Sequence, residues 1–102
     1  ASAERLFLPG VGAAAYAMRR IADLGLAPVL RGFERPALGI CLGMHLLFER
    51  SEEGNAGGLA ILGGTVRKLL PAQGITIPHM GWSRLEVSAA DIGLTTGDYV
   101  YF

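Results

Sequence analysis

The part of the sequence that most restricts the possible folds is ALGICLGMHLLF, residues 37–48. The short apolar run at residues 37–40 is typical of a buried strand, and residues 42–48 are predicted to be helical. Cys41 lies between them, so the chain passes from strand to helix through a sharp turn. Apolar runs and helical segments also alternate upstream, which indicates a parallel sheet with crossover helices. We therefore expect an α/β fold.

The upstream segments follow the same alternation. Residues 6–8 (LFL) are predicted to form a buried strand that a Pro-Gly pair ends. Residues 13–24 are Ala-rich and predicted to be helical, with Gly25 as the stop just past their end. Residues 29–33 are predicted to form a short helical turn that Pro28 opens.

The pattern changes after residue 49. Residues 50–58 (RSEEGNAGG) are polar and Gly-rich, and we expect a loop there. Short apolar runs separated by Gly, Pro and polar residues then predict strands at residues 59–62, 65–69, 75–77, 85–87 and 99–102. The second half of the chain is therefore predicted to be β-rich.

Composition argues against several classes of function. The 102 residues are 51% apolar and carry 9 basic and 9 acidic side chains, which is not the composition of a disordered tail. A net charge of zero provides no electrostatic footprint for nucleic acid or an anionic membrane, and no apolar run approaches the roughly 18 residues of a membrane span. A single cysteine forms neither an internal disulfide nor a multi-cysteine metal site. We expect a cytoplasmic protein without metal or cofactor.

The strongest candidate for chemistry is Cys41, within the sequence Gly39-Ile40-Cys41-Leu42-Gly43. This G-x-C-x-G spacing is that of a nucleophile elbow, where the nucleophile occupies a strained strand-to-helix turn and small residues on both sides prevent collisions. A helix start favours the thiolate, and the Leu42 amide points toward the space where an oxyanion would form. The alternative is a buried structural cysteine, which is common in apolar surroundings.

Two further motifs carry weaker signals. Residues 9–12 (PGVG) follow a predicted strand and should reach the same carboxyl edge of the sheet as Cys41, where α/β folds bind ligands. Alone, they would be an ordinary loop. Residues 78–82 (PHMGW) place a histidine and the single tryptophan in an apolar loop. Exposed Trp and Met are typical interface anchors, and the alternative is a Trp that packs over the core.

Four segments together closely resemble the glutaminase subunits of imidazole glycerol phosphate synthases: LPGVG (8–12), LGICLGMHLLF (38–48), ERSEEG (49–54) and IPHMGW (77–82). These subunits are triad-type glutamine amidotransferases of histidine biosynthesis. The resemblance implies a flavodoxin-like, doubly wound α/β domain, of which residues 1–102 would be the central part. It also implies hydrolysis of L-glutamine to glutamate and ammonia, with the ammonia passed to a TIM-barrel cyclase subunit in a heterodimer.

The resemblance also implies roles for individual residues. Cys41 would attack the glutamine side-chain amide and form a γ-glutamyl thioester. The N–H of Leu42 and a backbone N–H of the Gly10-Val11 turn would form the oxyanion hole, and this turn is expected to rearrange when the partner binds its substrate. The implied substrate-binding residues are Gly12, His45 and Glu53, and the implied cyclase-facing residues are His79, Met80 and Trp82.

The sequence also departs from the family's pattern. His45 stands where the family usually has Gln, and Ser83 where it usually has Asn. The family's His-x-Glu pair and its first strand-helix-strand unit are absent from residues 1–102, so we expect these residues alone to be inactive. We expect His45 to be a core or substrate-pocket residue and His79 to face the partner, neither being the catalytic base. The alternatives are a non-catalytic fragment or scaffold, and a related amidotransferase of another synthase.

Overall fold

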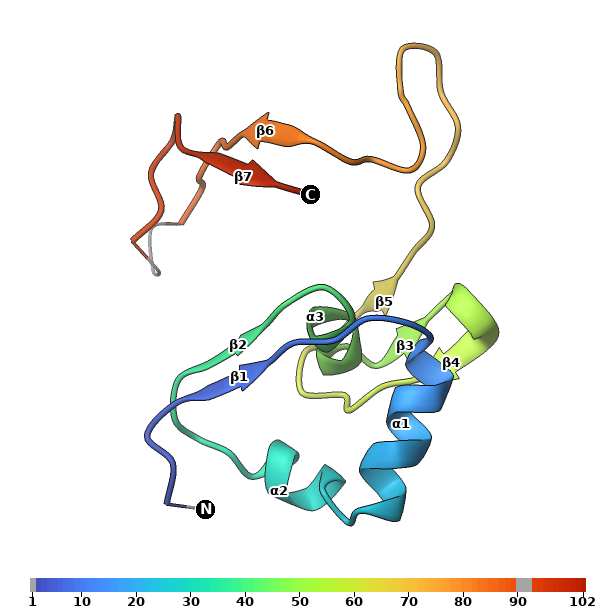
Figure 1. Ribbon diagram of the computed structural model, residues 1–102, viewed down its shortest axis with the longest axis vertical. Helices are drawn as coiled ribbons and strands as arrows, with labels where there is room; N and C mark the ends of the chain where they lie inside the picture. The colour runs from blue at the N-terminus through green and yellow to red at the C-terminus, as the bar shows by residue number, and fades with distance from the viewer. Residues whose placement is uncertain (1, 90–92) are drawn as a thin grey trace. The chain divides into compact units, whose positions relative to one another are not determined.

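The computed structural model describes residues 2–89 and 93–102, which divide into two units, residues 2–68 and residues 69–102 (Figure 1). The first unit combines helices with short strands, and the described part of the second unit contains a pair of strands. The expectation of an α/β fold is confirmed at this level, as a mixed α/β chain with small sheets.

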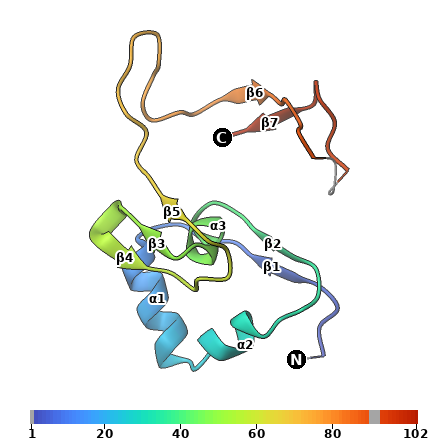
Figure 2. The same ribbon diagram turned by 180° about the vertical axis from the view of Figure 1, so that it is seen from behind.

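The first unit begins with the expected strand-helix-strand arrangement. β1 (Leu6–Leu8) and β2 (Ala37–Gly39) are parallel and lie side by side in both views (Figures 1 and 2). Their paired residues are Leu6 with Ala37, Phe7 with Leu38, and Leu8 with Gly39. The connection between them carries α1 (Ala14–Asp23) and α2 (Ala27–Arg31), because parallel strands need a long crossover. Both predicted strands are confirmed, but their predicted burial is wrong, since Phe7 is 64% and Leu38 44% exposed. Among the described residues, β1 and β2 pair only with each other, so no further strand shields them.

The two crossover helices follow local signals in the sequence. α1 ends one residue before its predicted end, and Gly25 then takes a φ of 64°. This is the left-handed conformation that glycine adopts at little steric cost just past a helix. α2 begins earlier than predicted, at Ala27, and Pro28 lies in its first turn, where a missing N–H removes no helical hydrogen bond.

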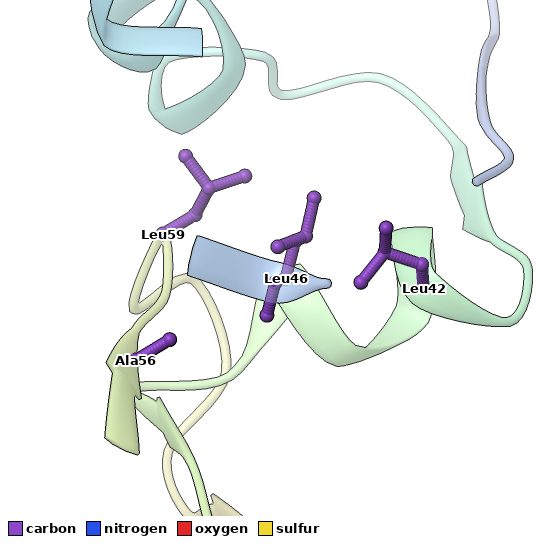
Figure 3. Packing of buried hydrophobic residues seen from close by; sticks show 5 residues of the cluster. Leu42, Leu46, Ala56 and Leu59 are labelled. Carbon is purple, nitrogen blue, oxygen red and sulfur yellow. The ribbon is translucent and has the colours of Figure 1, made fainter. Parts of the chain in front are cut away.

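The core of the first unit gathers on α3 (Leu42–Leu47), the helix predicted directly after Cys41. Leu42 and Leu46 are one turn apart, so they project from the same face of α3 (Figure 3). The buried hydrophobic residues in the described part of the chain are Ala14, Leu42, Leu46, Ala56 and Leu59. The helix that follows Cys41 is therefore held in the core along one face.

Residues 50–58, expected to be a loop, contain two short strands instead. β3 (Arg50–Ser51) pairs antiparallel with β4 (Ala56–Gly57) and parallel with β5 (Thr65–Val66), which gives a small three-stranded sheet. The 3-10 helix η1 (Glu53–Asn55) connects β3 to β4, and its glycine takes a φ of 66°. The loop prediction is wrong here because the Gly and Asn residues that suggested it form a tight turn between paired strands.

Residues 59–62, predicted to be a strand, form none. Their N–H groups donate instead to carbonyls at the end of α3, Leu59 N to Leu46 O at 2.7 Å and Ile61 N to Leu47 O at 2.9 Å. The last carbonyls of a helix have no partner within the helix, and this segment supplies the missing donors. The prediction is wrong because an apolar run that hydrogen-bonds to a helix end, with only Leu59 buried, has the same composition as a strand.

In the second unit, β6 (Trp82–Arg84) and β7 (Tyr99–Tyr101) form an antiparallel pair. The strand expected at residues 99–102 is therefore confirmed. The strand expected at residues 85–87 is wrong in position, since the pairing lies three residues earlier. Beyond β6, the N–H of Val87 donates to a side chain, that of Thr96, at 3.0 Å, and the regular strand ladder does not extend that far.

Two other strand predictions are only partly right or wrong. In the stretch 65–69, only Thr65 and Val66 pair with another strand. Residues 75–77 form no strand, and the N–H of Ile75 donates to the carbonyl of Ala72 at 3.1 Å, which closes a turn. Apart from η1, the regular structure in the described residues after 49 consists of short strands, and only in this sense is that half β-rich.

Candidate functional site

Cys41 occupies the junction between β2 and α3. Its backbone has a φ of 54° and a ψ of −121°, a conformation that is strained for any residue with a side chain. Cys41 is exposed, and its thiol is free. The alternative of a buried structural cysteine is therefore wrong, and the exposed, strained turn that the G-x-C-x-G spacing predicts is present.

Glycines on both sides of Cys41 are required by close backbone packing. A Cβ atom on Gly43 would lie 1.6 Å from the carbonyl oxygen of Leu8, at the end of β1. A Cβ atom on Gly39 would lie 2.8 Å from the Cα of Met44. Both distances are far below ordinary van der Waals contact, so no other residue fits these positions without a backbone shift. The prediction that small residues on both sides of Cys41 prevent collisions is therefore confirmed.

The turn after β1 lies directly against the start of α3. The N–H of Leu42 donates to the carbonyl of Gly10 at 3.3 Å, and a Cβ atom on Gly10 would lie 3.2 Å from that of Leu42. The structure therefore brings together Cys41, Leu42 and the Gly10-Val11 turn, as expected from the sheet edge. The Leu42 N–H, which was predicted to face an oxyanion, is therefore already hydrogen-bonded to a carbonyl oxygen in this conformation.

The residues next to that contact are open to solvent. Val11 is 92% exposed. Gly12 has a φ of 102°, and nothing lies within 4 Å of the position its Cβ would occupy. The peptide groups of this turn therefore have space to rotate.

A cavity of about 540 Å³ lies next to α3 and the small sheet. Its lining residues are His45, Ser51, Glu52, Glu53, Val66, Arg67 and Lys68. Two predicted substrate-binding residues, His45 and Glu53, thus share one cavity, which contains side chains of both charge signs. A cavity of this kind fits a zwitterionic ligand such as an amino acid.

The remaining predicted site residues do not line that cavity. Cys41 and Gly12 are not among its lining residues, so the structure does not join the thiol and the cavity into one enclosed site. The lining residues that were not predicted from the sequence are Ser51, Glu52, Val66, Arg67 and Lys68. For Ser51 a signal existed, because a serine two residues before a turn residue is a common local hydrogen-bond acceptor.

The predicted partner-facing residues lie in the second unit, and two of them are conspicuously exposed. Met80 and Trp82 are each 71% exposed. Trp82 contacts Tyr101 edge to face, with ring centroids 5.6 Å apart. His79 shares a hydrogen bond of 3.2 Å with the hydroxyl of Ser83, and its ring lies 5.2 Å from that of Phe102. The alternative of a Trp packed over the core is therefore wrong.

The described residues lack two kinds of feature, a cluster of metal-binding side chains and a long apolar helix. In residues 2–89 and 93–102, no group of three or more His, Cys, Asp or Glu side chains is arranged to hold a metal ion. Across the same ranges, no helix combines the length and the apolar character needed to cross a membrane.

The geometry at Cys41, a strained strand-to-helix turn between close-packed glycines on a mixed α/β chain, has the form of a nucleophile elbow. No family model matches the chain. It is, however, 50% identical over 98% of its length to the "Imidazole glycerol phosphate synthase subunit HisH" of Xanthomonas euvesicatoria pv. vesicatoria, of which it covers 52%.

Similar identities hold for two other HisH subunits. That of Xanthomonas axonopodis pv. citri is 54% identical over 93% of the chain, and that of Xylella fastidiosa strain 9a5c is 55% identical over 81%. The chain covers 47% and 42% of these proteins. It thus spans about half the length of the curated relatives it matches. The resemblance to this synthase's glutaminase subunit, predicted from the motifs, is confirmed.

Proposed function

We propose that the chain is part of a glutamine amidotransferase that hydrolyses L-glutamine to glutamate and ammonia for imidazole glycerol phosphate synthesis in histidine biosynthesis. The observation that supports this most strongly is Cys41, exposed and strained at a glycine-packed elbow in a chain about half identical to HisH subunits. The fold that we propose for the whole domain is the doubly wound, flavodoxin-like type, with residues 1–102 as its central part. We place the protein in the cytoplasm.

In the proposed reaction, the Cys41 thiolate attacks the side-chain amide carbon of glutamine. The C–N bond of the tetrahedral intermediate then breaks, the leaving nitrogen takes a proton from a general acid, and ammonia departs from a γ-glutamyl thioester. A water molecule, deprotonated by the same group acting as base, attacks the thioester carbon. Glutamate leaves and the thiolate is restored.

The oxyanion hole requires a change in the turn after β1. The Leu42 N–H donates to the Gly10 carbonyl in the present conformation, so it is not available to a substrate oxygen. We propose that the Gly10-Val11 peptide rotates, which frees this N–H and presents that of Val11 beside it. The exposure of Val11 and the open space around Gly12 support this. In keeping with the family, the rotation would respond to substrate binding by the partner.

The proposed roles of His45 and Glu53 follow from the cavity that they share. Glu53 is the carboxylate that would pair with the α-ammonium group of glutamine, and His45 would contribute a polar wall where the family usually has Gln. Neither His45 nor His79 is followed by a residue and then Glu. We therefore propose that the base and its orienting carboxylate come from a His-x-Glu pair outside residues 1–102.

The proposed partner is the TIM-barrel cyclase subunit, in a heterodimer that completes the lyase reaction. His79, Met80 and Trp82 are the residues that we assign to that contact. Large exposed aromatic and Met side chains are the types that become buried at the centre of protein interfaces, which supports the assignment.

The test is release of glutamate from glutamine by the assembled enzyme carrying Cys41→Ala. Removing the nucleophile should lower kcat at least about 10³-fold, because no other group can form the thioester. Ser88→Ala, at an exposed serine of the second unit, is the matched control and should retain full activity. Turnover by Cys41→Ala comparable to that control would refute the proposed function.

A further inference from the structure

Glu52 and Glu53 are adjacent in sequence but differ in what holds them. The Glu52 carboxylate accepts a hydrogen bond from the main-chain N–H of Lys68 at 2.9 Å, and its own N–H donates to the carbonyl of Val66 at 2.9 Å. Both bonds join β3 to the chain around β5. The Glu52 carboxylate therefore stabilises the small sheet, although Glu52 also lines the cavity.

Ser51 holds the next residue in a different way. It is 4% exposed, and its hydroxyl oxygen accepts a hydrogen bond from the main-chain N–H of Glu53 at 3.2 Å. Ser51 itself cannot move freely, because it pairs with Ala56 on one side and with Val66 on the other, in the central strand of its sheet. The turn that carries Glu53 is thus fixed to a buried residue that pairs with both neighbouring strands.

We propose that Ser51 is a positioning residue for substrate binding. Its buried hydroxyl fixes the turn so that Glu53, and not Glu52, offers its carboxylate to the α-ammonium group of the amino-acid substrate. This inference rests on the proposed function. The physical gain is that a main chain already ordered before binding does not have to be ordered by the ligand.

The test compares ligands with and without an α-ammonium group on the assembled enzyme. Ser51→Ala should raise the KM for L-glutamine about five- to tenfold, with kcat changed less than about twofold, since a hydrogen bond to a binding turn is lost while the nucleophile is untouched. The inhibition constant of glutaramate, which is glutamine without its α-amino group, should change less than about twofold. Ser51→Thr keeps the hydroxyl and should restore most of the KM.

A pair of neighbouring carboxylate variants keeps the proposal falsifiable if Ser51→Ala does not fold. Glu53→Gln should reproduce the loss that is selective for the α-ammonium group. Glu52→Gln should affect glutamine and glutaramate to the same degree. A selective loss in Glu52→Gln, or an equal effect of Ser51→Ala on both ligands, would overturn the proposal.

The outcome of the Cys41→Ala test separates this inference from the function on which it rests. If Cys41→Ala remains active, the proposed function fails and the role of Ser51 fails with it. If Cys41→Ala is inactive but Ser51→Ala shows no selectivity for the α-ammonium group, only the positioning role is wrong.

Discussion

The two units of the chain differ in how their residues are constrained. In the first unit, the described residues include a buried core and a backbone contact, Gly43 against Leu8, that only glycine permits. In the second, no described residue is fully buried, and aromatic side chains lie exposed on an antiparallel pair of strands. Under the proposed function, the first unit would supply fixed geometry for chemistry, while the second would supply side chains for recognition.

The most severe way to break the first unit is Gly43→Ala. Alanine normally stabilises a helix relative to glycine, but here its Cβ would lie 1.6 Å from the Leu8 carbonyl oxygen. The Leu8 carbonyl is main chain and the added Cβ is fixed to the helix backbone, so neither can turn aside as a flexible side chain would. We therefore expect a loss of about 3 kcal/mol or more in the free energy of unfolding, measured by urea denaturation. Gly63→Ala, where nothing lies within 4 Å of the added atom, is the matched control. An equally small effect at both positions would contradict the close packing.

A smaller effect is expected from Leu59→Ala in the core of the same unit. Leu59 is 0% exposed, so truncation leaves a cavity and removes apolar contacts. The free energy of unfolding should fall by about 2–3 kcal/mol, the lower part of the usual range, because the core around it is small. Leu70→Ala, at an exposed leucine, should cost less than about 0.5 kcal/mol. Similar losses for both variants would show that the first unit has no defined core.

The smallest effect is expected in the second unit, from Trp82→Ala. The indole contacts Tyr101 edge to face across paired strands but is mostly exposed, so the free energy of unfolding should fall by only about 0.5–1.5 kcal/mol. Trp82→Phe retains an aromatic ring and should recover much of the loss. The free energy of binding to the proposed cyclase partner, measured by calorimetry, should fall far more than the free energy of unfolding does. A variant that loses stability but binds normally would place Trp82 outside the interface.

The sequence predicted well the features that depend on neighbouring residues. The glycine-flanked turn at Cys41, the stop at Gly25 and the parallel pairing around the crossover helices all follow from local steric rules. The strand predicted at residues 59–62 failed because its hydrogen bonds go to the end of α3, a partner that apolar composition does not reveal. Likewise, the side chain of Thr96 accepts the bond that would have continued the strand ladder beyond β6.

The candidate site was predictable only in part. Cys41 carries its own signal in the G-x-C-x-G spacing, whereas His45 and Glu53 were reached through the family resemblance alone. Nothing in the sequence shows that these two share a cavity, because the hairpin that carries Glu53 was predicted to be a loop. The hydrogen bond from the Leu42 N–H to the Gly10 carbonyl could not be predicted either, since it depends on the orientation of one peptide group.

The contact between Gly43 and Leu8 also limits how the neighbouring turn can move. With a helix backbone pressed against the last carbonyl of β1, the strand cannot slide along the helix without a collision. Residues 9–12 can then move only by rotation about backbone bonds that follow Leu8, while β1 and α3 stay in place. Gly43, which allows the close packing beside Cys41, thus also restricts the turn after β1 to rotations about a few backbone torsion angles.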